Sequence, residues 1–239
     1  QSYFLCQLNQ EQLSKALFPI GHLQKSEVRK IAGELGLVTA DKKDSQGLCF
    51  VGKVRLPEFL QQQLKPKKGK VYNIDPKTLQ AQHAKDESNE LTYQAYEIEA
   101  EMGEEIGQHN GAHYYTIGQR KGLGIGGFEE PLFVIGTNTK KNEIYTGLGE
   151  THVGLYRNGL RVAANDVHWV NPQYALSNGE ELRCMARIRY RQSLQQAKVK
   201  CVDGDLLVYF PQAQKSITPG QFVAFYHEDE LIGSGVIAE

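Results

Sequence analysis

Residues 182–191 show the clearest alternation of hydrophobic and polar positions in the chain. The even positions carry Leu182, Cys184, Ala186, Ile188 and Tyr190, and the odd ones carry Arg183, Met185, Arg187, Arg189 and Arg191. A period of two is typical of a β-strand with one face on the core. We therefore predict a strand over 182–191 with an arginine-lined outer side. Several arginines on one strand face favour contact with the phosphates or bases of RNA.

Short apolar runs of this kind continue from Leu160 to the C-terminus. They cover residues 160–163, 168–170, 182–191, 198–201, 206–210, 221–226 and 231–237. Asp203-Gly204 between two of them is a hairpin turn signal. About six short strands separated by turns predict a small closed β-barrel. Cys184 and Cys201 fall on core-facing positions, so we expect them to be packing residues.

The region ahead of the barrel mixes strand and helix patterns. We predict one hairpin with strands at 71–74 and 79–82 and its turn at 75–78. We predict a second hairpin with strands at 132–135 and 143–146 and its turn at 140–142, and a single strand over 114–117. Helices are predicted after Asn9, with Gln12 closing a capping box, after Ser26 with Gly36 as the stop, and from Pro57 to Leu64. The fold class is therefore α+β, with a helical and α+β central region followed by a C-terminal six-stranded barrel.

Composition limits the compartment and the kind of partner. No run of about 18 apolar residues occurs, so we expect no membrane span, and no basic and apolar leader supports secretion. The four cysteines lie far apart, which argues against a zinc site or a disulfide scaffold and favours a reducing cytoplasm. The net charge is −1, so a nucleic-acid surface has to come from local patches.

Two neighbouring segments carry opposite charge. Residues 42–70 have a net charge of +6, and residues 83–105 have a net charge of −7. The basic segment is either a solvated face or a contact for an RNA backbone. We expect the acidic segment to be a surface excursion, with a short helix or an added strand, that does not contact RNA.

Two further patterns concern possible ligand sites. His109 and His113 are four residues apart, but Asn110-Gly111 between them breaks a helix, so we expect a structural role rather than a metal site. The glycine-rich loop from Gly118 to Gly127 lacks the spacing of a Walker loop, so we do not expect ATP to bind there.

Cys49 is the candidate reactive residue. It follows a turn-forming Asp44-Ser45-Gln46-Gly47 and lies near Lys42 and Lys43. Positive charge and turn amides favour the thiolate, which is the nucleophilic form. Taken by itself, the pattern also fits a small buried packing residue.

Several motifs in order resemble the bacterial tRNA-specific 2-thiouridylases (the MnmA family). The segment Asp44-Ser45-Gln46-Gly47-Leu48-Cys49-Phe50-Val51-Gly52 resembles the motif around that family's second cysteine. Further matches are Gln1-Ser2-Tyr3-Phe4-Leu5, Gly118 to Gly127, Arg189-Tyr190-Arg191-Gln192 and Thr218-Pro219-Gly220-Gln221. Together they cover nearly the whole chain.

The resemblance implies an activity and a set of site residues. The family's enzymes put sulfur on C2 of the wobble uridine in the tRNAs for Lys, Glu and Gln, after ATP has adenylated the C2 oxygen. Cys49 would receive sulfur as a persulfide from a sulfur-relay protein or a cysteine desulfurase. Gln1, Arg189, Tyr190 and Gln221 fall at the family's tRNA-contact positions.

The resemblance also implies a missing part. In the family, the ATP-binding domain and the first catalytic cysteine precede the matched region. That domain is expected to take Mg²⁺ as well, and that cysteine can form a disulfide with the residue at Cys49. We therefore expect a fragment that is inactive alone, with no cofactor or metal of its own. Its predicted parts are residues 1–55 as a remnant of the catalytic domain, 56–155 as a central domain and 156–239 as a tRNA-binding barrel.

Two rival interpretations stay open. The chain could be an RNA-binding module without catalysis, which would bind tRNA by shape. It could also be a sulfur carrier or redox protein that uses Cys49 only. The sequence does not identify the sulfur donor, the oligomeric state or the role of residues 83–105.

Overall fold

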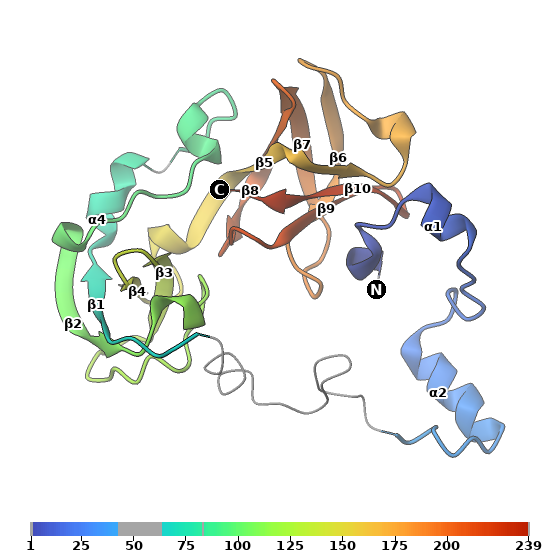
Figure 1. Ribbon diagram of the computed structural model, residues 1–239, viewed down its shortest axis with the longest axis horizontal. Coiled ribbons are helices and arrows are strands. Elements are labelled where there is room, and N and C mark those ends of the chain that lie inside the picture. Colours follow the sequence, from blue (N-terminus) through green and yellow to red (C-terminus); the bar gives the residue numbers. More distant parts are fainter. Residues whose placement is uncertain (1, 43–63, 83, 239) are drawn as a thin grey trace. The chain divides into compact units, whose positions relative to one another are not determined.

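The computed structural model describes residues 2–42, 64–82 and 84–238. The chain divides into two compact units, one made of Gln1–Asn9 with Pro66–Glu239 and the other of Gln10–Lys65. The larger unit holds a mixed four-stranded sheet and a closed six-stranded barrel (Figure 1). The predicted α+β fold with a C-terminal barrel is confirmed.

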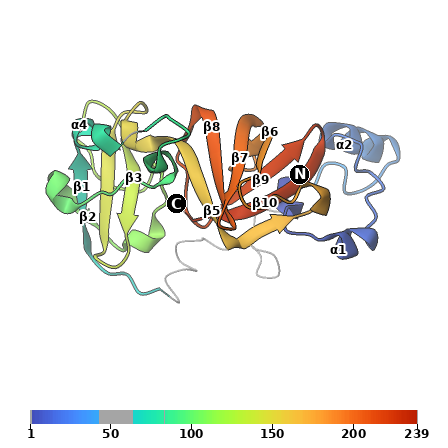
Figure 2. The same ribbon diagram turned by 90° about the horizontal axis from the view of Figure 1, so that it is seen from above.

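The sheet has the strand order β2-β1-β4-β3. Figure 2 shows β1, β2 and β3 in this part of the chain. Its strands are β1 (Gly69–Ile74), β2 (Gly103–His109), β3 (Leu132–Asn138) and β4 (Glu143–Leu148). β1 pairs antiparallel with β2 and parallel with β4, and β3 and β4 form the hairpin that the sequence predicts. Successive residues of β3 face opposite sides, so Phe133 packs in one apolar cluster and Val134 in another. Both faces of the sheet are therefore covered.

Short helical turns connect these strands. They are α4 (Pro76–Leu79), η2 (Gln80–Gln82), η3 (Glu90–Tyr93), η4 (Ala100–Met102), η5 (Ala112–Tyr114) and η6 (Val153–Leu155). The predicted hairpin over 71–82 is wrong, because Asp75 caps α4 by accepting a 2.8 Å hydrogen bond from the amide of Lys77. The predicted strand over 114–117 is also wrong, since η5 occupies its start.

The barrel closes in the order β10-β5-β8-β7-β6-β9. Its strands are β5 (Tyr156–Trp169), β6 (Glu181–Arg187), β7 (Gln195–Val202), β8 (Asp205–Lys215), β9 (Phe222–His227) and β10 (Glu230–Ile237), with η7 (Pro172–Tyr174) after β5. Asp203 and Gly204 both have positive φ in the turn between β7 and β8, as the sequence predicts. Cys201 is buried in the barrel core and Cys184 packs against it, so their packing role is confirmed.

The N-terminal residues complete a second cluster on the barrel. η1 (Ser2–Leu5) places Tyr3, and the next turn places Cys6, against Ala224 and Tyr226. The hydroxyl of Ser234 donates a 2.6 Å hydrogen bond to the carbonyl of Cys6. Residues from the beginning of the chain are thus part of the barrel's packing.

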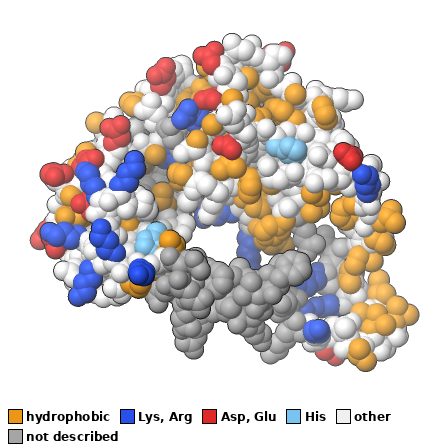
Figure 3. Space-filling view, in the orientation of Figure 1, with side chains coloured by type: hydrophobic (Ala, Val, Ile, Leu, Met, Phe, Trp, Pro, Cys, Tyr) orange, Lys and Arg blue, Asp and Glu red, His pale blue; other side chains and the backbone are white. Residues whose placement is uncertain are grey.

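The smaller unit contains two short helices, α1 (Gln10–Ser14) and α2 (Lys25–Glu34). The cap of α2 is Gln24, which forms a capping box with Glu27, rather than the predicted Ser26; Gly36 follows its end with φ of 65°. Neither helix has a buried residue, and apolar side chains gather on the surface here (Figure 3). Leu17 is 89% and Val38 100% exposed. Helices this short are marginal without packing, so we expect this unit to be weakly stable by itself.

The acidic segment is bound to the rest of the larger unit more closely than we expected. Thr92 and Tyr93 in η3 are buried, and the hydroxyl of Tyr209 donates a 2.7 Å hydrogen bond to the carbonyl of Lys85. Its carboxylates pair with lysines: Glu87 with Lys198, Glu99 with Lys141 and Glu105 with Lys70. η3 is the expected short helix, but the prediction of a surface excursion is wrong there because η3 is partly buried. The expected added strand is β2, which begins within the acidic segment at Gly103. Among the described residues, no helix has the length and apolar character needed to cross a membrane.

Candidate nucleic-acid interface

Tyr3 links two of the segments that carry predicted RNA contacts. Its hydroxyl donates to the carbonyl of Phe222 at 2.9 Å and lies 3.3 Å from the carbonyl of Ile188. Burial raises the pKa of Tyr3, so the hydroxyl stays protonated as a donor. Because Ile188 precedes Arg189 and Phe222 follows Gln221, the structure brings Arg189, Tyr190 and Gln221 to one part of the barrel. We call Phe4, Arg189, Tyr190 and Gln221 the barrel rim.

Arg189 is held by backbone carbonyls. Its Nη2 donates to the carbonyl of Lys215 and, at 3.3 Å, to that of Ser216. Burial lowers the pKa of Arg189, but a guanidinium remains charged at any physiological pH. Both contacts use Nη2, and the guanidinium has further N–H donors, so Arg189 can bind this segment and a phosphate at once.

Tyr190 forms an exposed aromatic pair with Phe4. Their ring centroids are 4.6 Å apart, and the rings are tilted by 39°. Phe4 is 69% exposed and Tyr190 is 36% exposed. Exposed aromatic rings beside a cation are suited to stacking with an unpaired RNA base. The sequence motifs contained Phe4, but its pairing with Tyr190 depends on a fold that joins residues far apart in the chain.

Gln221 lies in the turn that leads into β9. Its amide donates to the carbonyl of Thr218 at 3.3 Å, and its carbonyl accepts a 2.8 Å hydrogen bond from the amide of Ile237. Gly220 has a φ of 81°, which favours glycine at this turn. The backbone position of Gln221 is thus fixed by both ends of its turn.

The predicted strand over 182–191 is confirmed as far as Arg187, and Leu182, Cys184, Ala186 and Ile188 face the core as expected. The continuous arginine face is wrong. β6 ends at Arg187, because Gln192 folds the chain back by accepting a 2.9 Å hydrogen bond from the amide of Ile188. Arg187 is half-buried, lies 4.9 Å from the ring centroid of Tyr226 and donates to the carbonyl of Tyr190 at 3.3 Å. Tyr190, predicted to face the core, is exposed instead. Arg187 therefore packs against the barrel, whereas Arg189 bonds to the segment after β8, and the two do not share one face of a strand.

Cys49 and Gln1, two of the predicted site residues, lie outside the described residues. The described cysteines are Cys6, Cys184 and Cys201, which are all free thiols. Burial raises the pKa of Cys184 to about 12 and also raises that of Cys6. Neither is suited to forming a thiolate at neutral pH, so they do not replace Cys49 as a reactive residue.

The two histidines of the pair have different surroundings. His109 is buried, and its Nδ1 accepts a 2.9 Å hydrogen bond from the amide of Gly111 while its Nε2 lies 3.2 Å from the carbonyl of Asn142. His113 is exposed and packs against Tyr114. These contacts support the structural role that the sequence favoured for His109.

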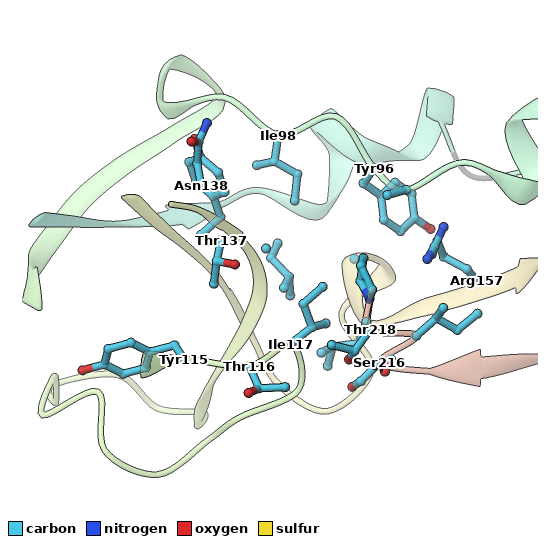
Figure 4. Close-up of a pocket in the computed structure, with 18 of the residues that line it drawn as sticks. Tyr96, Ile98, Tyr115, Thr116, Ile117, Thr137, Asn138, Arg157, Ser216 and Thr218 are labelled. Atoms are coloured by element: carbon cyan, nitrogen blue, oxygen red, sulfur yellow. Dashed lines mark hydrogen bonds between the residues drawn. The ribbon is translucent and has the colours of Figure 1, made fainter. Parts of the chain in front are cut away.

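A cavity of about 600 Å³ lies where the sheet meets the barrel within the larger unit (Figure 4). The loop from Tyr115 to Ile117, the end of β3 and the turn from Ser216 to Pro219 contribute to its walls. Ser216 also accepts the hydrogen bond from Arg189, so the cavity and the barrel rim share one segment. This cavity could not be predicted from the sequence, because its walls come from several regions that lie far apart in the chain.

Comparison with known proteins shows three family matches along the chain. Residues 1–53 match the family described as tRNA methyl transferase HUP domain, residues 91–148 the tRNA methyl transferase PRC-barrel domain, and residues 160–237 the aminomethyltransferase beta-barrel domain.

The chain is also similar to proteins named tRNA-specific 2-thiouridylase MnmA. It is 55% identical to that of Flavobacterium johnsoniae and 56% identical to that of Christiangramia forsetii, over 100% of this chain and 62% of each relative. With the protein of Karelsulcia muelleri, identity is 43% over 100% of this chain and 61% of the relative. The chain thus spans about three fifths of the length of these relatives.

Proposed function

The chain belongs to the family of tRNA-specific 2-thiouridylases, and on that premise we propose that it forms part of an enzyme that replaces the C2 oxygen of a tRNA wobble uridine with sulfur. The observation that carries this proposal is the 55% identity to a named 2-thiouridylase over the whole chain. The grouping of Arg189, Tyr190 and Gln221 around Tyr3 supports it further.

In this proposal the barrel rim binds tRNA. Arg189 provides a cation for a backbone phosphate, and Phe4 with Tyr190 provides a surface on which an unpaired base stacks. Gln221 and Gln1 would contact the same RNA. The wobble base has to leave its stack to be modified, which is the usual requirement for chemistry on a base.

Cys49 is proposed to carry the sulfur. As a persulfide, its outer sulfur forms the bond to C2 of the adenylated uridine while the C2–O bond breaks and the oxygen leaves with AMP. A second cysteine then attacks Cys49, so the S–S bond to the transferred sulfur breaks, a disulfide forms and 2-thiouridine is released. We infer that the sulfur comes from a sulfur-relay protein or a cysteine desulfurase, that the substrates are the tRNAs for Lys, Glu and Gln, and that the reaction takes place in the cytoplasm.

The described residues do not fit ATP. The loop from Gly118 to Gly127 leads into β3 rather than a helix, so it offers no helix N-terminus for a phosphate. Arg120 and Lys121 are exposed on this loop. We therefore assign the activation of the C2 oxygen to none of the residues described here.

The test uses this chain joined to the N-terminal part of the F. johnsoniae relative that it does not cover. Cys49→Ser should abolish 2-thiouridine in tRNA, measured by mass spectrometry of nucleosides, while tRNA binding persists. Cys184→Ser is the matched control and should retain activity, because that thiol has a pKa of about 12. The same measurement separates thiolation from methylation, which the names of two matched domains mention.

The Cys49→Ser result also distinguishes the proposed enzyme from a rival function. A non-catalytic RNA-binding module is favoured by the exposed Phe4–Tyr190 pair, which needs no thiol to bind a base. Normal thiolation in the Cys49→Ser variant would eliminate the proposed catalytic role and leave this alternative.

A further inference from the structure

The cavity between sheet and barrel has a size suited to a small ligand. Its volume of about 600 Å³ lies within the range of roughly 300–1,000 Å³ that is usual for small-molecule sites. Such sites occur preferentially between structural layers or domains. Here β3 and the preceding loop form one side, while the start of β5 and the turn after β8 form the other (Figure 4).

The charge of the cavity favours an anion. Arg157 at the start of β5 and Lys140 after β3 line it, and none of the described residues in its wall is Asp or Glu. Arg157 is only 8% exposed. Figure 4 shows its guanidinium next to the hydroxyl of Tyr96. The positive charge of Arg157 lowers the pKa of Tyr96, whereas burial, the larger effect, raises it. A buried guanidinium in a wall without carboxylates is suited to a phosphate group.

The other walls favour a planar ring with polar edges. Tyr96, Tyr115 and Tyr145 contribute aromatic surface, and Ile98 and Ile117 contribute aliphatic surface. Hydroxyl and amide groups line the same space on Thr116, Thr137, Asn138, Ser216 and Thr218. This combination of ring surface, hydrogen-bonding edges and a cation matches a nucleobase, a ribose and a phosphate.

Ser216 fixes one wall. It is 4% exposed and has a φ of 58°, a conformation unfavourable for a residue other than glycine. Its amide donates a 2.6 Å hydrogen bond to the carbonyl of Leu155, and its carbonyl accepts one of 3.0 Å from the hydroxyl of Thr218. These bonds hold the turn open in its unusual conformation, so the wall is preformed.

From these observations we propose that the cavity between the sheet and the barrel is a binding site for a single nucleotide, with Arg157 on its phosphate and the tyrosine-lined walls on its base. The nucleotide is either a free nucleoside monophosphate or one unit of an RNA strand. Neither Phe4 nor Tyr190 lines this cavity, and the proposal does not depend on the proposed thiolation.

The test titrates the chain itself with UMP, AMP, uridine and inorganic phosphate by calorimetry. The monophosphates should bind, and uridine or phosphate alone should bind about tenfold more weakly or worse, because each lacks one half of the contacts. Arg157→Gln should weaken UMP binding about tenfold or more and leave uridine binding unchanged. Absence of UMP binding, or equal binding of UMP and uridine, would overturn the proposal.

A second variant covers the case in which Arg157→Gln does not fold. Thr116 is exposed at the edge of the cavity, so Thr116→Trp should fill the entrance without disturbing the core and should abolish UMP binding. Thr151→Trp, at another exposed turn position, is the matched control and should bind normally. Unchanged binding in Thr116→Trp would place any nucleotide elsewhere and reject the cavity.

A short oligouridylate distinguishes the two sources. If the site takes one unit of an RNA strand, the oligouridylate competes with UMP, and Thr116→Trp abolishes its competition. If the site takes free nucleotides, UMP binds and the oligouridylate does not displace it. Either result supports a nucleotide site and identifies its occupant.

Discussion

Two buried histidines share one hydrogen-bonding arrangement. His109 and His152 each accept, through Nδ1, the amide hydrogen of the glycine two residues later, at 2.9 and 3.1 Å. Each Nε2 lies near a carbonyl, that of Asn142 for His109 and that of Ile74 for His152, at 3.2 and 3.0 Å. Only the neutral imidazole can accept at Nδ1 and donate at Nε2. Both side chains therefore stabilise the sheet as uncharged groups.

This arrangement predicts loss of stability in mild acid. Burial lowers the pKa of both His109 and His152, whereas in the unfolded chain each has a pKa of about 6.5. The unfolded state therefore binds more protons as the pH falls below that value, so the free energy of unfolding should decrease from about pH 7 towards pH 5. Urea denaturation across this range measures the effect.

Variants assign the effect to the buried ring. His109→Gln should be less stable at neutral pH but show a flatter dependence on pH. His113→Gln, which changes an exposed histidine four residues away, should retain the dependence of the parent chain. If His109→Gln and the parent lose stability equally between pH 7 and 5, other groups are responsible.

Arg189 is a second single residue whose replacement should have a measurable effect, here on RNA affinity. Arg189→Ala should weaken tRNA binding by the chain and make it less dependent on salt, because one phosphate contact is lost. The exposed Arg183 on β6 provides the control, and Arg183→Ala should have a much smaller effect. An unchanged salt slope in Arg189→Ala would remove this residue from the proposed RNA surface.

At the scale of the element, regular alternation was a reliable guide, and local turn chemistry decided the exceptions. The hairpin of β3 and β4 could be predicted from its short apolar runs, and the barrel from its alternating apolar residues, because the turns between them carry Asp, Asn or Gly. The pattern failed over 71–82, where Asp75-Pro76 starts a helix, and over 188–191, where Gln192 bonds back to Ile188. In both places one side-chain hydrogen bond ended the strand pattern.

Asp75 tests that explanation. Asp75→Ala removes the acceptor for the amide of Lys77 and should lower the free energy of unfolding by about 1 kcal/mol, the usual value of an N-cap. Asp75→Asn keeps an acceptor oxygen and should recover most of the loss. Equal destabilisation by both variants, in urea denaturation, would show that the cap does not explain the helix at this position.

At the scale of the whole molecule, the barrel rim depends on both ends of the chain. Tyr3 and Cys6 pack with Ala224 and Tyr226, and the hydroxyl of Ser2 lies 3.3 Å from that of Tyr226. The sequence could predict the individual motifs at residues 1–5, 189–192 and 218–221. It could not predict that they meet, because their contacts cross nearly the full length of the chain.

The N-terminal residues should therefore support both stability and RNA binding. Deleting residues 1–9 exposes the cluster that Tyr3 and Cys6 cover, which should cost on the order of 3 kcal/mol of unfolding free energy, and it should also weaken tRNA binding. Tyr3→Phe separates the two effects, because it keeps the buried ring but removes the hydroxyl that bonds to Phe222. This variant should lose about 1 kcal/mol and misplace Arg189 relative to Gln221, so tRNA binding should fall more than stability. If Tyr3→Phe binds tRNA as well as the parent chain, the alignment of these segments through Tyr3 is not needed for recognition.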